Sequence, residues 1–313
     1  MRVGFLCMES VFSVRPLEAL LDAGHDVRFV MRPVGGVDTR KKPLLKRHGG
    51  FDVAVKRALG FVRGGGGVSD DDHKRNPFAV AARRAIPAYL VGDASCPAAV
   101  QLLRKERVDV VVIAFFNQLL RAPFLEVPAL GALNLHPSLL PLHRGPAPLF
   151  WTFKDGLFEA GLTLHKVAAG EDDGDVVLQE PVPAPLGTAG EDLVDELADR
   201  AALMVVDAVG ALAAGTSSAR PQDRERATRA PRPKDEDLLV DPALGAQRAF
   251  HFVRGVGRWN PLYVRTGSTR VRVVDALEVD ETRRLPGETA LTGDILHLGC
   301  HDGVVVLRAR IQP

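Results

Sequence analysis

The sequence has few cysteines and no long apolar run. Cys7, Cys96 and Cys300 are the only cysteines among its 313 residues, and they lie far apart. This usage suits a reducing compartment better than a disulfide framework, so we expect a cytoplasmic protein. No apolar run reaches the roughly 18 residues that a membrane-spanning helix needs. The first residues lack the charged start, apolar stretch and cleavage site of a signal peptide, so export is not expected.

A large excess of one charge is also missing. The chain has 40 Lys and Arg residues against 39 Asp and Glu residues, a formal net charge of +1. This balance excludes an overall polycation, so a nucleic-acid partner would have to meet a local basic patch. No glycine-rich fingerprint follows the first predicted strand, where the chain reads Cys7-Met8-Glu9-Ser10. A nicotinamide-dependent enzyme is therefore not expected.

A metal site is not expected either. His297, Cys300 and His301 are close in the sequence, but no second pair of ligands accompanies them. Structural metal sites in proteins usually need four such ligands. We interpret this stretch as a hairpin.

The apolar periodicity predicts an α/β fold. Residues 3–7, 26–31, 88–91 and 109–115 have the pattern of strands, and residues 16–23 and 97–106 have the pattern of helices. Strands that alternate with helices favour a doubly wound, mostly parallel sheet of the Rossmann-like kind. Two further strands are expected at 162–167 and 176–182, and a long amphipathic helix over 192–212.

We expect two domains. Residues 1–214 would form the first, residues 215–234 a linker rich in Ser, Arg and Pro, and residues 235–313 the second. The second domain opens with a helical pattern over 243–256 and continues in short alternating runs, typical of a small, OB-like β-barrel. The first domain contains an insertion at about 60–77, in which four consecutive glycines predict a mobile loop.

An amide and an imidazole stand at the end of one more predicted strand. Asn134 and His136 follow the apolar residues Ala132 and Leu133, and side chains two residues apart in a strand project to the same side. The carboxyl edge of an open α/β sheet is where such folds bind ligands. A helical pattern over 148–154 and a further strand precede Asp172, so the chain has room to return a carboxylate to this imidazole.

These three groups have complementary chemistry. An asparagine amide donates a hydrogen bond to a developing oxyanion, and a histidine moves protons near neutral pH. A carboxylate orients the imidazole, raises its basicity or holds a proton-relaying water. No serine or cysteine stands where it would obviously attack, which favours a tetrahedral intermediate formed by an external nucleophile. We interpret His165, in the following strand, as a buried core or supporting histidine.

Four motifs together resemble the 10-formyltetrahydrofolate-dependent formyltransferases. They are Asn134-x-His136, Ser138-Leu139-Leu140-Pro141, Arg144-Gly145-x-Ala147-Pro148 and Asp172-x-Gly174-Asp175. The likeness extends to the C-terminus, where residues 240–261 are similar to the entry into the small barrel of methionyl-tRNA formyltransferase. The resemblance implies a formyltransferase fold and transfer of a formyl group from the cosubstrate 10-formyltetrahydrofolate, without a metal, to a primary amine.

The resemblance also implies roles for individual residues. Asn134, His136 and Asp172 match the family's catalytic amide, imidazole and carboxylate. In the implied mechanism, Asn134 and protonated His136 stabilise the oxyanion, and Asp172 tunes His136 and relays the proton of the amine. The folate contacts that it implies are the pterin-reading segment Gln118, Leu119 and Leu120 and the turn Ser138, Leu139, Leu140 and Pro141.

The sequence leaves the amine acceptor open. Initiator methionyl-tRNA is the first candidate, because residues 242–274 contain arginines interleaved with aromatic residues and no acidic residue. A solvated charged face over core aromatics is the alternative interpretation of this segment. The loop at 34–42 and the pair Phe116-Asn117 match the tRNA-formylating members only loosely. A nucleotide-linked amino sugar, water as the attacking group, and an inactive RNA-binding protein are the other candidates. The arginines proposed to meet tRNA are Arg248, Arg254, Arg258, Arg270 and Arg272.

Overall fold

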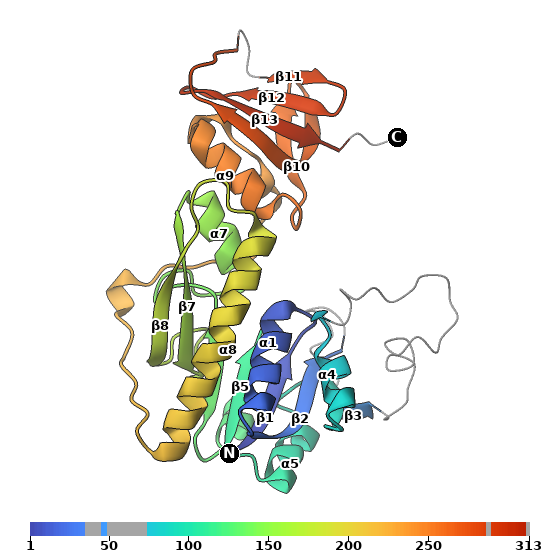
Figure 1. The fold of residues 1–313 in the computed structure, drawn as a ribbon, viewed down its shortest axis with the longest axis vertical. Helices are drawn as coiled ribbons and strands as arrows, with labels where there is room; N and C mark the ends of the chain where they lie inside the picture. Colours follow the sequence, from blue (N-terminus) through green and yellow to red (C-terminus); the bar gives the residue numbers. More distant parts are fainter. Residues whose placement is uncertain (35–44, 49–73, 286–288, 311–313) are drawn as a thin grey trace, which may run out of the picture. The chain divides into compact units, whose positions relative to one another are not determined.

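A computed structural model describes residues 1–34, 45–48, 74–285 and 289–310 (Figure 1). The chain divides into two compact units. The first contains Met1–Leu142, Leu162–Glu180 and Asp195–Ala227, and the second contains His143–Gly161, Pro181–Val194 and Thr228–Pro313. The predicted domain boundaries stay a prediction. Of the expected insertion at 60–77, the four glycines lie outside the described residues, as does most of the loop at 34–42.

An eight-stranded sheet with the order β3-β4-β2-β1-β5-β6-β7-β8 organises the first unit. The run of strands from β4 to β6 is parallel throughout, while β3 is antiparallel to β4 and β7 is antiparallel to β6. The prediction of an α/β fold with a mostly parallel sheet is confirmed. The strands are β1 (Arg2–Cys7), β2 (Asp26–Pro33), β3 (Leu45–His48), β4 (Ala88–Val91), β5 (Val110–Ala114), β6 (Ala132–His136), β7 (Glu159–Lys166) and β8 (Val176–Pro183).

The helices around this sheet begin and end where local chemistry allows. Helix α1 begins at Val11, earlier than the sequence pattern predicted, because the Ser10 hydroxyl accepts a hydrogen bond from the Phe12 amide at 3.1 Å. Pro16 therefore lies inside the helix and does not start it. Helix α5 matches its predicted range. The helices are α1 (Val11–Asp22), α4 (Pro77–Arg83), α5 (Pro97–Glu106), α6 (Ala122–Leu125) and α8 (Gly190–Ala214).

The core of the first unit lies against β1, β2 and β5. Every residue of β5 is buried, which explains its uninterrupted apolar sequence, because a central parallel strand has no solvent-facing side. Leu6, Phe29, Leu103 and Phe124 are fully buried in the same cluster. Burial of each such side chain contributes about 1.5–3 kcal/mol. This rigid centre fixes the position of the strand ends beside it.

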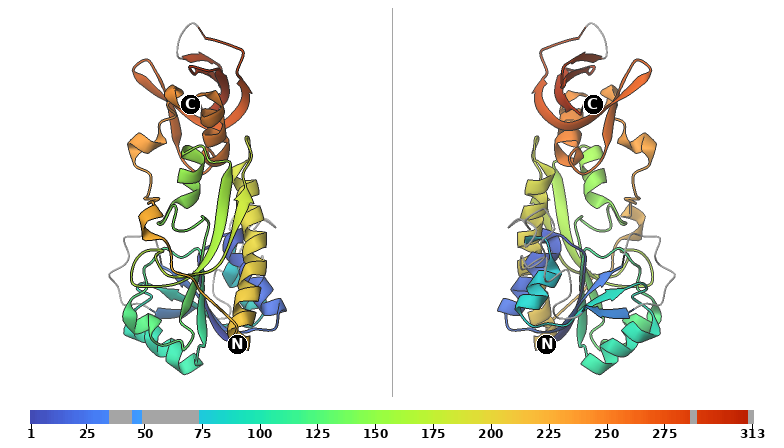
Figure 2. Two further views of the ribbon diagram at one scale, coloured as in Figure 1. Left: turned by 90° about the vertical axis from the view of Figure 1, so that its left-hand side faces the viewer. Right: turned by 90° about the vertical axis from the view of Figure 1, so that its right-hand side faces the viewer.

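A second, antiparallel sheet with the order β11-β12-β13-β10-β9 follows in the second unit. Its edge strands β9 and β11 approach each other, so the sheet curls (Figure 2). The strands β12 and β13 confirm the hairpin predicted around Cys300. The elements of this unit are α7 (Pro148–Lys154), α9 (Ala246–Val256), β9 (Leu262–Thr266), β10 (Thr269–Asp280), β11 (Thr289–Thr292), β12 (Ile295–Gly299) and β13 (Val304–Ala309), with 3₁₀ turns at Asp235–Leu238 and Pro242–Leu244.

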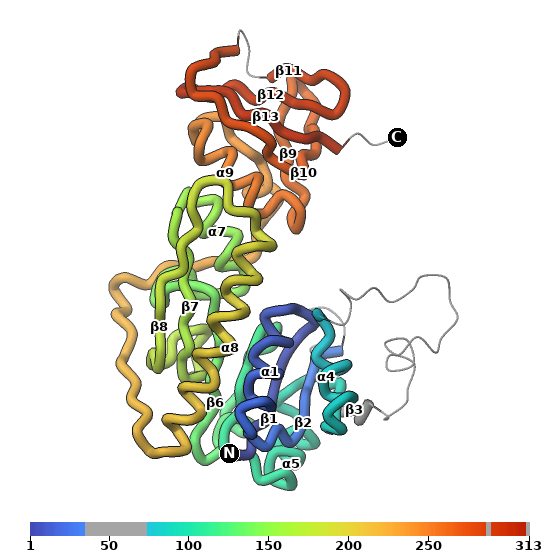
Figure 3. The backbone as a smooth tube through the Cα atoms, in the orientation of Figure 1, coloured from blue at the N-terminus to red at the C-terminus, as the bar shows by residue number. Residues whose placement is uncertain are grey.

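The chain that follows α8 runs beside β8, as Figure 3 shows. Arg220 forms a two-way backbone pair with Val176, with N–O distances of 2.9 and 2.8 Å. A 3₁₀ turn at Arg224–Arg226 comes next. The first part of the predicted linker is therefore bonded to the sheet.

Two negative observations concern the described residues. Among them, no helix combines the length and the apolar character needed to cross a bilayer. Within the same ranges, no group of three or more His, Cys, Asp or Glu side chains is arranged to hold a metal ion. Cys7, Cys96 and Cys300 carry free, buried thiols.

Helices α7 and α9 pack through aromatic rings around a buried histidine. The His251 ring lies 4.9 Å from the ring centre of Phe153 and 5.1 Å from that of Phe158. Its Nε2 lies 3.1 Å from the carbonyl oxygen of Leu157, and its Nδ1 is buried without a hydrogen-bond partner. Burial lowers the pKa of His251, since the charged imidazolium loses its hydration there.

This burial predicts that acid weakens the fold. The folded pKa lies below the ordinary value of 6.5, so the unfolded chain binds the proton more tightly. The contribution of His251 is therefore complete above about pH 6.5 and is lost as the pH falls below it, by at most about 1.4 kcal/mol per pH unit. Urea unfolding of wild type and His251→Gln between pH 7.5 and 5 measures this. The variant keeps a donor for Leu157 and should lose less stability, and equal slopes would contradict the expectation.

Candidate active site

The position of β6 in the sheet places its polar side chains. β6 lies between the parallel strand β5 and the antiparallel strand β7. In this register Asn134 lies opposite His165, and His136 lies opposite Thr163. Directly opposed residues in adjacent strands project to the same face with their side chains in contact range. Both polar residues of β6 therefore have a polar neighbour on β7.

The structure brings Asn134, His136 and Asp172 together. The Asn134 amide nitrogen donates to Oδ1 of Asp172 at 3.3 Å. Nδ1 of His136 lies 3.6 Å from Oδ2 of the same carboxylate. The His136 and Asp172 side chains are 6% and 15% exposed, so solvent screens their interaction only weakly. The carboxylate thus faces the amide through one oxygen and the imidazole through the other.

His165 completes this cluster. Its Nε2 lies 3.1 Å from the Asn134 amide nitrogen, and its Nδ1 lies 2.8 Å from the carbonyl oxygen of Lys166. An amide nitrogen only donates, so Nε2 must accept, and Nδ1 carries the hydrogen that is donated to Lys166. The 3.5 Å separation between His165 Nε2 and Asp172 is then not an ion pair. Instead, the amide of Asn134 bridges two acceptors.

The loop that carries Asp172 has little freedom. Asp172 has a left-handed backbone with φ of 53°, which asparagine and aspartate adopt more readily than other non-glycine residues. Two positions later, a Cβ on Gly174 would lie 1.8 Å from the carbonyl oxygen of Lys166. Only glycine fits there. The Asp-x-Gly spacing therefore reflects a close passage of the loop over the end of β7.

The predicted pterin-reading segment follows β5. Phe115 and Leu119 are exposed, whereas Leu120 is buried in the core of the first unit. The Gln118 side chain accepts from the Ala94 amide at 2.9 Å and donates to the Gly92 carbonyl at 3.0 Å. Its side chain thus ties the segment to the loop after β4. The assignment of Gln118, Leu119 and Leu120 to the folate stays a prediction.

A hydrogen-bonded network holds the predicted folate turn. The Ser138 hydroxyl donates to the Leu142 carbonyl at 2.7 Å, and the peptide bond between Leu140 and Pro141 is cis. The Thr163 hydroxyl donates to the Ser138 carbonyl at 2.6 Å and accepts from the Leu140 amide at 3.2 Å. Ser138 and Leu140 are buried, and Leu139 and Pro141 are half-buried. Side-chain hydrogen bonds thus hold the backbone of this turn at several points.

The motif Arg144-Gly145-x-Ala147-Pro148 has a structural explanation within the second unit. Arg144 pairs through its backbone with Thr228 and Ala230 at 3.0 and 2.7 Å. Gly145 has φ of 124°, and a Cβ there would lie 2.8 Å from the Ala230 carbonyl oxygen. This stretch therefore fixes the course of the backbone.

The geometry can be compared with known proteins. The formyl transferase family model matches residues 66–209. Methionyl-tRNA formyltransferase from Deinococcus radiodurans is 34% identical over 248 residues, which are 77% of this chain and 76% of that protein. The chain belongs to the formyl transferase family. The prediction of a formyl-transferring enzyme is confirmed.

Two further relatives extend the likeness of this formyltransferase to nearly the whole chain. Methionyl-tRNA formyltransferase from Acidobacterium capsulatum is 28% identical over 98% of this chain and 90% of that protein. The N-formyltransferase from Helicobacter canadensis, solved with folinic acid and dTDP-3-aminofucose, has a TM-score of 0.68 at 12% identity over 99% of both chains. At that identity the second likeness shows the fold alone.

Two glutamines that were not predicted from the sequence also support this site of the formyltransferase. Gln179 donates to the Leu140 carbonyl and to the Thr163 hydroxyl, both at 2.8 Å. Gln222 donates to the carbonyls of Asp172 and Gly174. The alternation of Thr163 and His165 along one strand was a local signal for a polar face. The two glutamines gave none, because their contacts are distant in the sequence.

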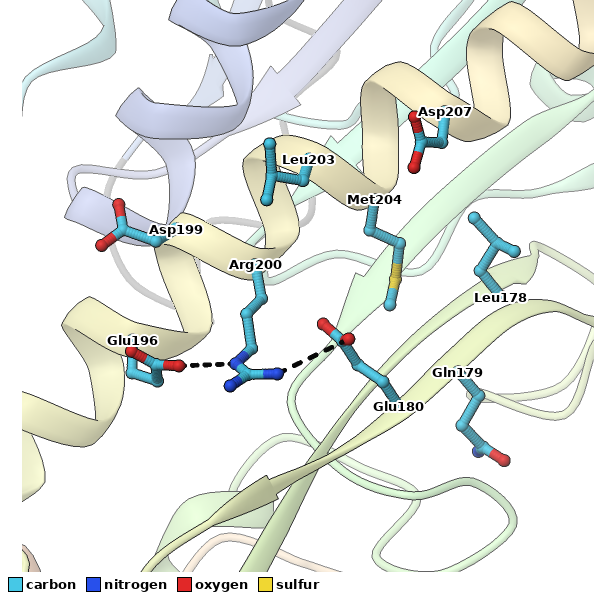
Figure 4. Close-up of a pocket in the computed structure, with 9 residues that line it drawn as sticks. All are labelled: Leu178, Gln179, Glu180, Glu196, Asp199, Arg200, Leu203, Met204 and Asp207. Carbon is cyan, nitrogen blue, oxygen red and sulfur yellow. Dashed lines mark hydrogen bonds and ion pairs between the residues drawn. The ribbon is translucent and has the colours of Figure 1, made fainter.

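A hollow of about 560 Å³ lies between β8 and α8 of the formyltransferase. Four carboxylates and one guanidinium line it, and Arg200 pairs with Glu196 and Glu180 (Figure 4). Leu178 and Glu180 line it from β8, and Gln179 points its amide away from Arg200. The residues predicted to bind folate do not line this hollow. We do not assign the folate to it.

The five arginines predicted to meet tRNA have partners in the second unit of the formyltransferase or are partly buried there. Arg254 and Arg258 both pair with the buried Asp275, at 2.9 and 3.2 Å. Burial acts to raise the pKa of Asp275, but the two guanidinium hydrogen bonds outweigh it and leave the pKa lowered. Arg270 pairs with Asp235, and Arg248 donates to the Lys154 carbonyl. The Nε atom of Arg272 is buried and lacks a hydrogen-bond partner.

We predict that Gly174→Ala disables the formyltransferase. The new methyl group meets a backbone oxygen, so the loop must move and the Asp172 carboxylate moves with it. Overpacking of this kind costs about 1–3 kcal/mol, and a displacement of about 1 Å at a catalytic group lowers turnover about 100-fold. Urea unfolding and a formyl-transfer assay measure both effects.

Gly210→Ala is the matched control. Nothing lies within 4 Å of a Cβ at Gly210, which is in α8. Alanine there should stabilise the helix by roughly 0.5–1 kcal/mol and leave transfer unchanged. A stable, fully active Gly174→Ala variant would show that the Asp172 loop tolerates displacement.

Proposed function

We propose that this enzyme transfers the formyl group of 10-formyltetrahydrofolate to the amino group of initiator methionyl-tRNA. The observation that carries the proposal is the meeting of Asn134, His136 and Asp172 at the end of β6. Relatives that are 28% and 34% identical are named methionyl-tRNA formyltransferases. We therefore take their acceptor as the first choice for this chain.

The proposed donor site uses the carboxyl edge of the sheet. The hydrogen-bonded Ser138–Pro141 turn and the exposed side chains of Phe115 and Leu119 would receive the folate. A flat heteroaromatic ring binds to apolar faces with a few fixed hydrogen bonds at its edge. The backbone of Gln118, Leu119 and Leu120 would supply the hydrogen bonds to the edge of this ring. The reaction needs no metal in this scheme.

The proposed mechanism is direct attack of the amine on the formyl carbon. The carbon–nitrogen bond to the acceptor forms, and the formyl oxygen becomes an oxyanion that Asn134 and protonated His136 stabilise. Asp172 holds His136 and takes up the proton that leaves the amine. The bond to the folate nitrogen then breaks, Asp172 delivers its proton to that nitrogen, and the products are the N-formyl amine and tetrahydrofolate.

The C-terminal part of the chain would hold the acceptor. We propose that residues 235–313 form an OB-like barrel module for RNA and that residues 1–214 carry the chemistry. The curled sheet and the arginine-rich stretch from Arg265 to Arg272 support this assignment. The pairing of Arg254, in α9, and of Arg258, in the turn after it, with Asp275 reduces the charge that this part of the chain offers to phosphate. The reaction would take place in the cytoplasm, where the three free thiols are stable.

The acceptor is tested with a panel. The purified protein is incubated with 10-formyltetrahydrofolate and, separately, with initiator methionyl-tRNA, a nucleotide-linked amino sugar, or no amine. We expect a formyl group on the methionyl-tRNA, detected by mass after hydrolysis of the ester. Formylation of the amino sugar alone would establish the small-molecule alternative. Donor loss without an amine would establish a hydrolase, and no reaction in any arm would contradict the proposal.

A single substitution tests the role of the carboxylate. We predict that Asp172→Asn lowers kcat about 10²–10⁴-fold, because the amide cannot accept a proton from the amine. The substitution keeps the size of the side chain, so the free energy of unfolding should change little. The matched control is Asp175→Asn at an exposed position of the same loop, with turnover near that of the wild type. Near-native turnover of folded Asp172→Asn would contradict the role of Asp172 as the proton acceptor.

A further inference from the structure

Gln222 lies in the segment that the sequence presented as a linker. The side chain is buried, and its residue is 9% exposed. The amide nitrogen donates to the Asp172 carbonyl at 2.9 Å and to the Gly174 carbonyl at 2.6 Å. These carbonyls stand on either side of Asp173. Both hydrogens of one amide group therefore hold the backbone of the same loop at two points, Asp172 and Gly174.

The backbone beside Gln222 is anchored independently. Arg220 pairs with Val176, the first residue of β8, in both directions. Pro221 follows and fixes one backbone angle of the next step. We name Arg220, Pro221 and Gln222 the strap. The strap is thus attached to the sheet at one residue and reaches back to the Asp172 loop with another.

The direction of the Asp172 carboxylate depends on this loop. The Cβ of a residue is fixed by its own backbone, and Asp172 has the left-handed conformation. Such a conformation persists in a non-glycine residue only when its surroundings hold it. The carboxylate has to face Asn134 through one oxygen and His136 through the other. A small rotation of the loop would break this double arrangement.

We propose that Gln222 is a positioning residue for formyl transfer, which holds the Asp172 carboxylate against His136 and Asn134 by clamping the backbone on both sides of Asp173. This inference rests on the proposed function, since it acts through Asp172. Gln222 donates to backbone carbonyls and takes no part in proton transfer. The strap is then a working part of the active site.

The test is a double-mutant cycle in the full chain. Gln222→Met keeps the length of the side chain and removes both donors. We expect kcat to fall about 10-fold or more, because a misplaced catalytic group loses its alignment, while KM for 10-formyltetrahydrofolate stays within about twofold. In the Asp172→Asn background the same substitution should cost less than about twofold, since the residue through which it acts is already disabled.

Controls separate this inference from the proposed function. Gln101→Met, at an exposed position of α5, should leave kcat unchanged. Hydrogen exchange of residues 170–176 should become faster in Gln222→Met and not in Gln101→Met. If Asp172→Asn is inactive and Gln222→Met is fully active, the inference fails and the proposed function stands. If Asp172→Asn is fully active, or the wild type transfers no formyl group, the proposed function fails and the inference fails with it.

Two further outcomes are decisive. An equal loss of kcat from Gln222→Met in both backgrounds would show a general structural role and would overturn the inference. If Gln222→Met does not fold, Gln222→Asn takes its place in the cycle, because it keeps the amide and shortens the reach by one methylene. A loss of kcat in folded Gln222→Asn that vanishes in the Asp172→Asn background supports the clamp. Wild-type turnover in that variant would contradict it.

Discussion

The register between β6 and β7 is the constraint on which the candidate site depends. It sets Asn134 opposite His165 and His136 opposite Thr163. A slip by one residue would turn every side chain of β6 to the other face of the sheet. The buried strand β5 on the other side of β6 makes such a slip costly, because its apolar residues would lose their partners. Packing in the core thus determines where the polar groups meet.

A supporting shell surrounds that register. Thr163 and Gln179 hold the Ser138–Pro141 turn through hydrogen bonds. Gln222 holds the Asp172 loop, and the missing side chain of Gly174 lets this loop pass close to the backbone of β7. Most of these contacts end on backbone carbonyls or amides. The side chains proposed for catalysis are therefore placed by interactions with the main chain, which leaves their functional atoms directed toward one another.

Local patterns predicted much of this molecule. The helices over 97–106 and 148–154 both begin at prolines, and this local signal was enough to predict their ranges. The apolar run of β5 and the Asn-x-His end of β6 were equally local. Strand β3 was not expected, because its pairing with β4 is antiparallel and joins distant segments. The contacts of Gln179 and Gln222 could not be predicted either, because they also join residues distant in the sequence. The early start of α1 depends on the hydrogen bond from the Phe12 amide to the Ser10 hydroxyl.

The bridging amide of Asn134 has one more consequence. It has two hydrogens, and in this structure His165 and Asp172 accept them. A formyl oxygen bound to this amide would take the hydrogen at the longer contact, the one to Asp172. The Asp172 carboxylate would then lose its hydrogen bond from Asn134 and keep its approach to Nδ1 of His136.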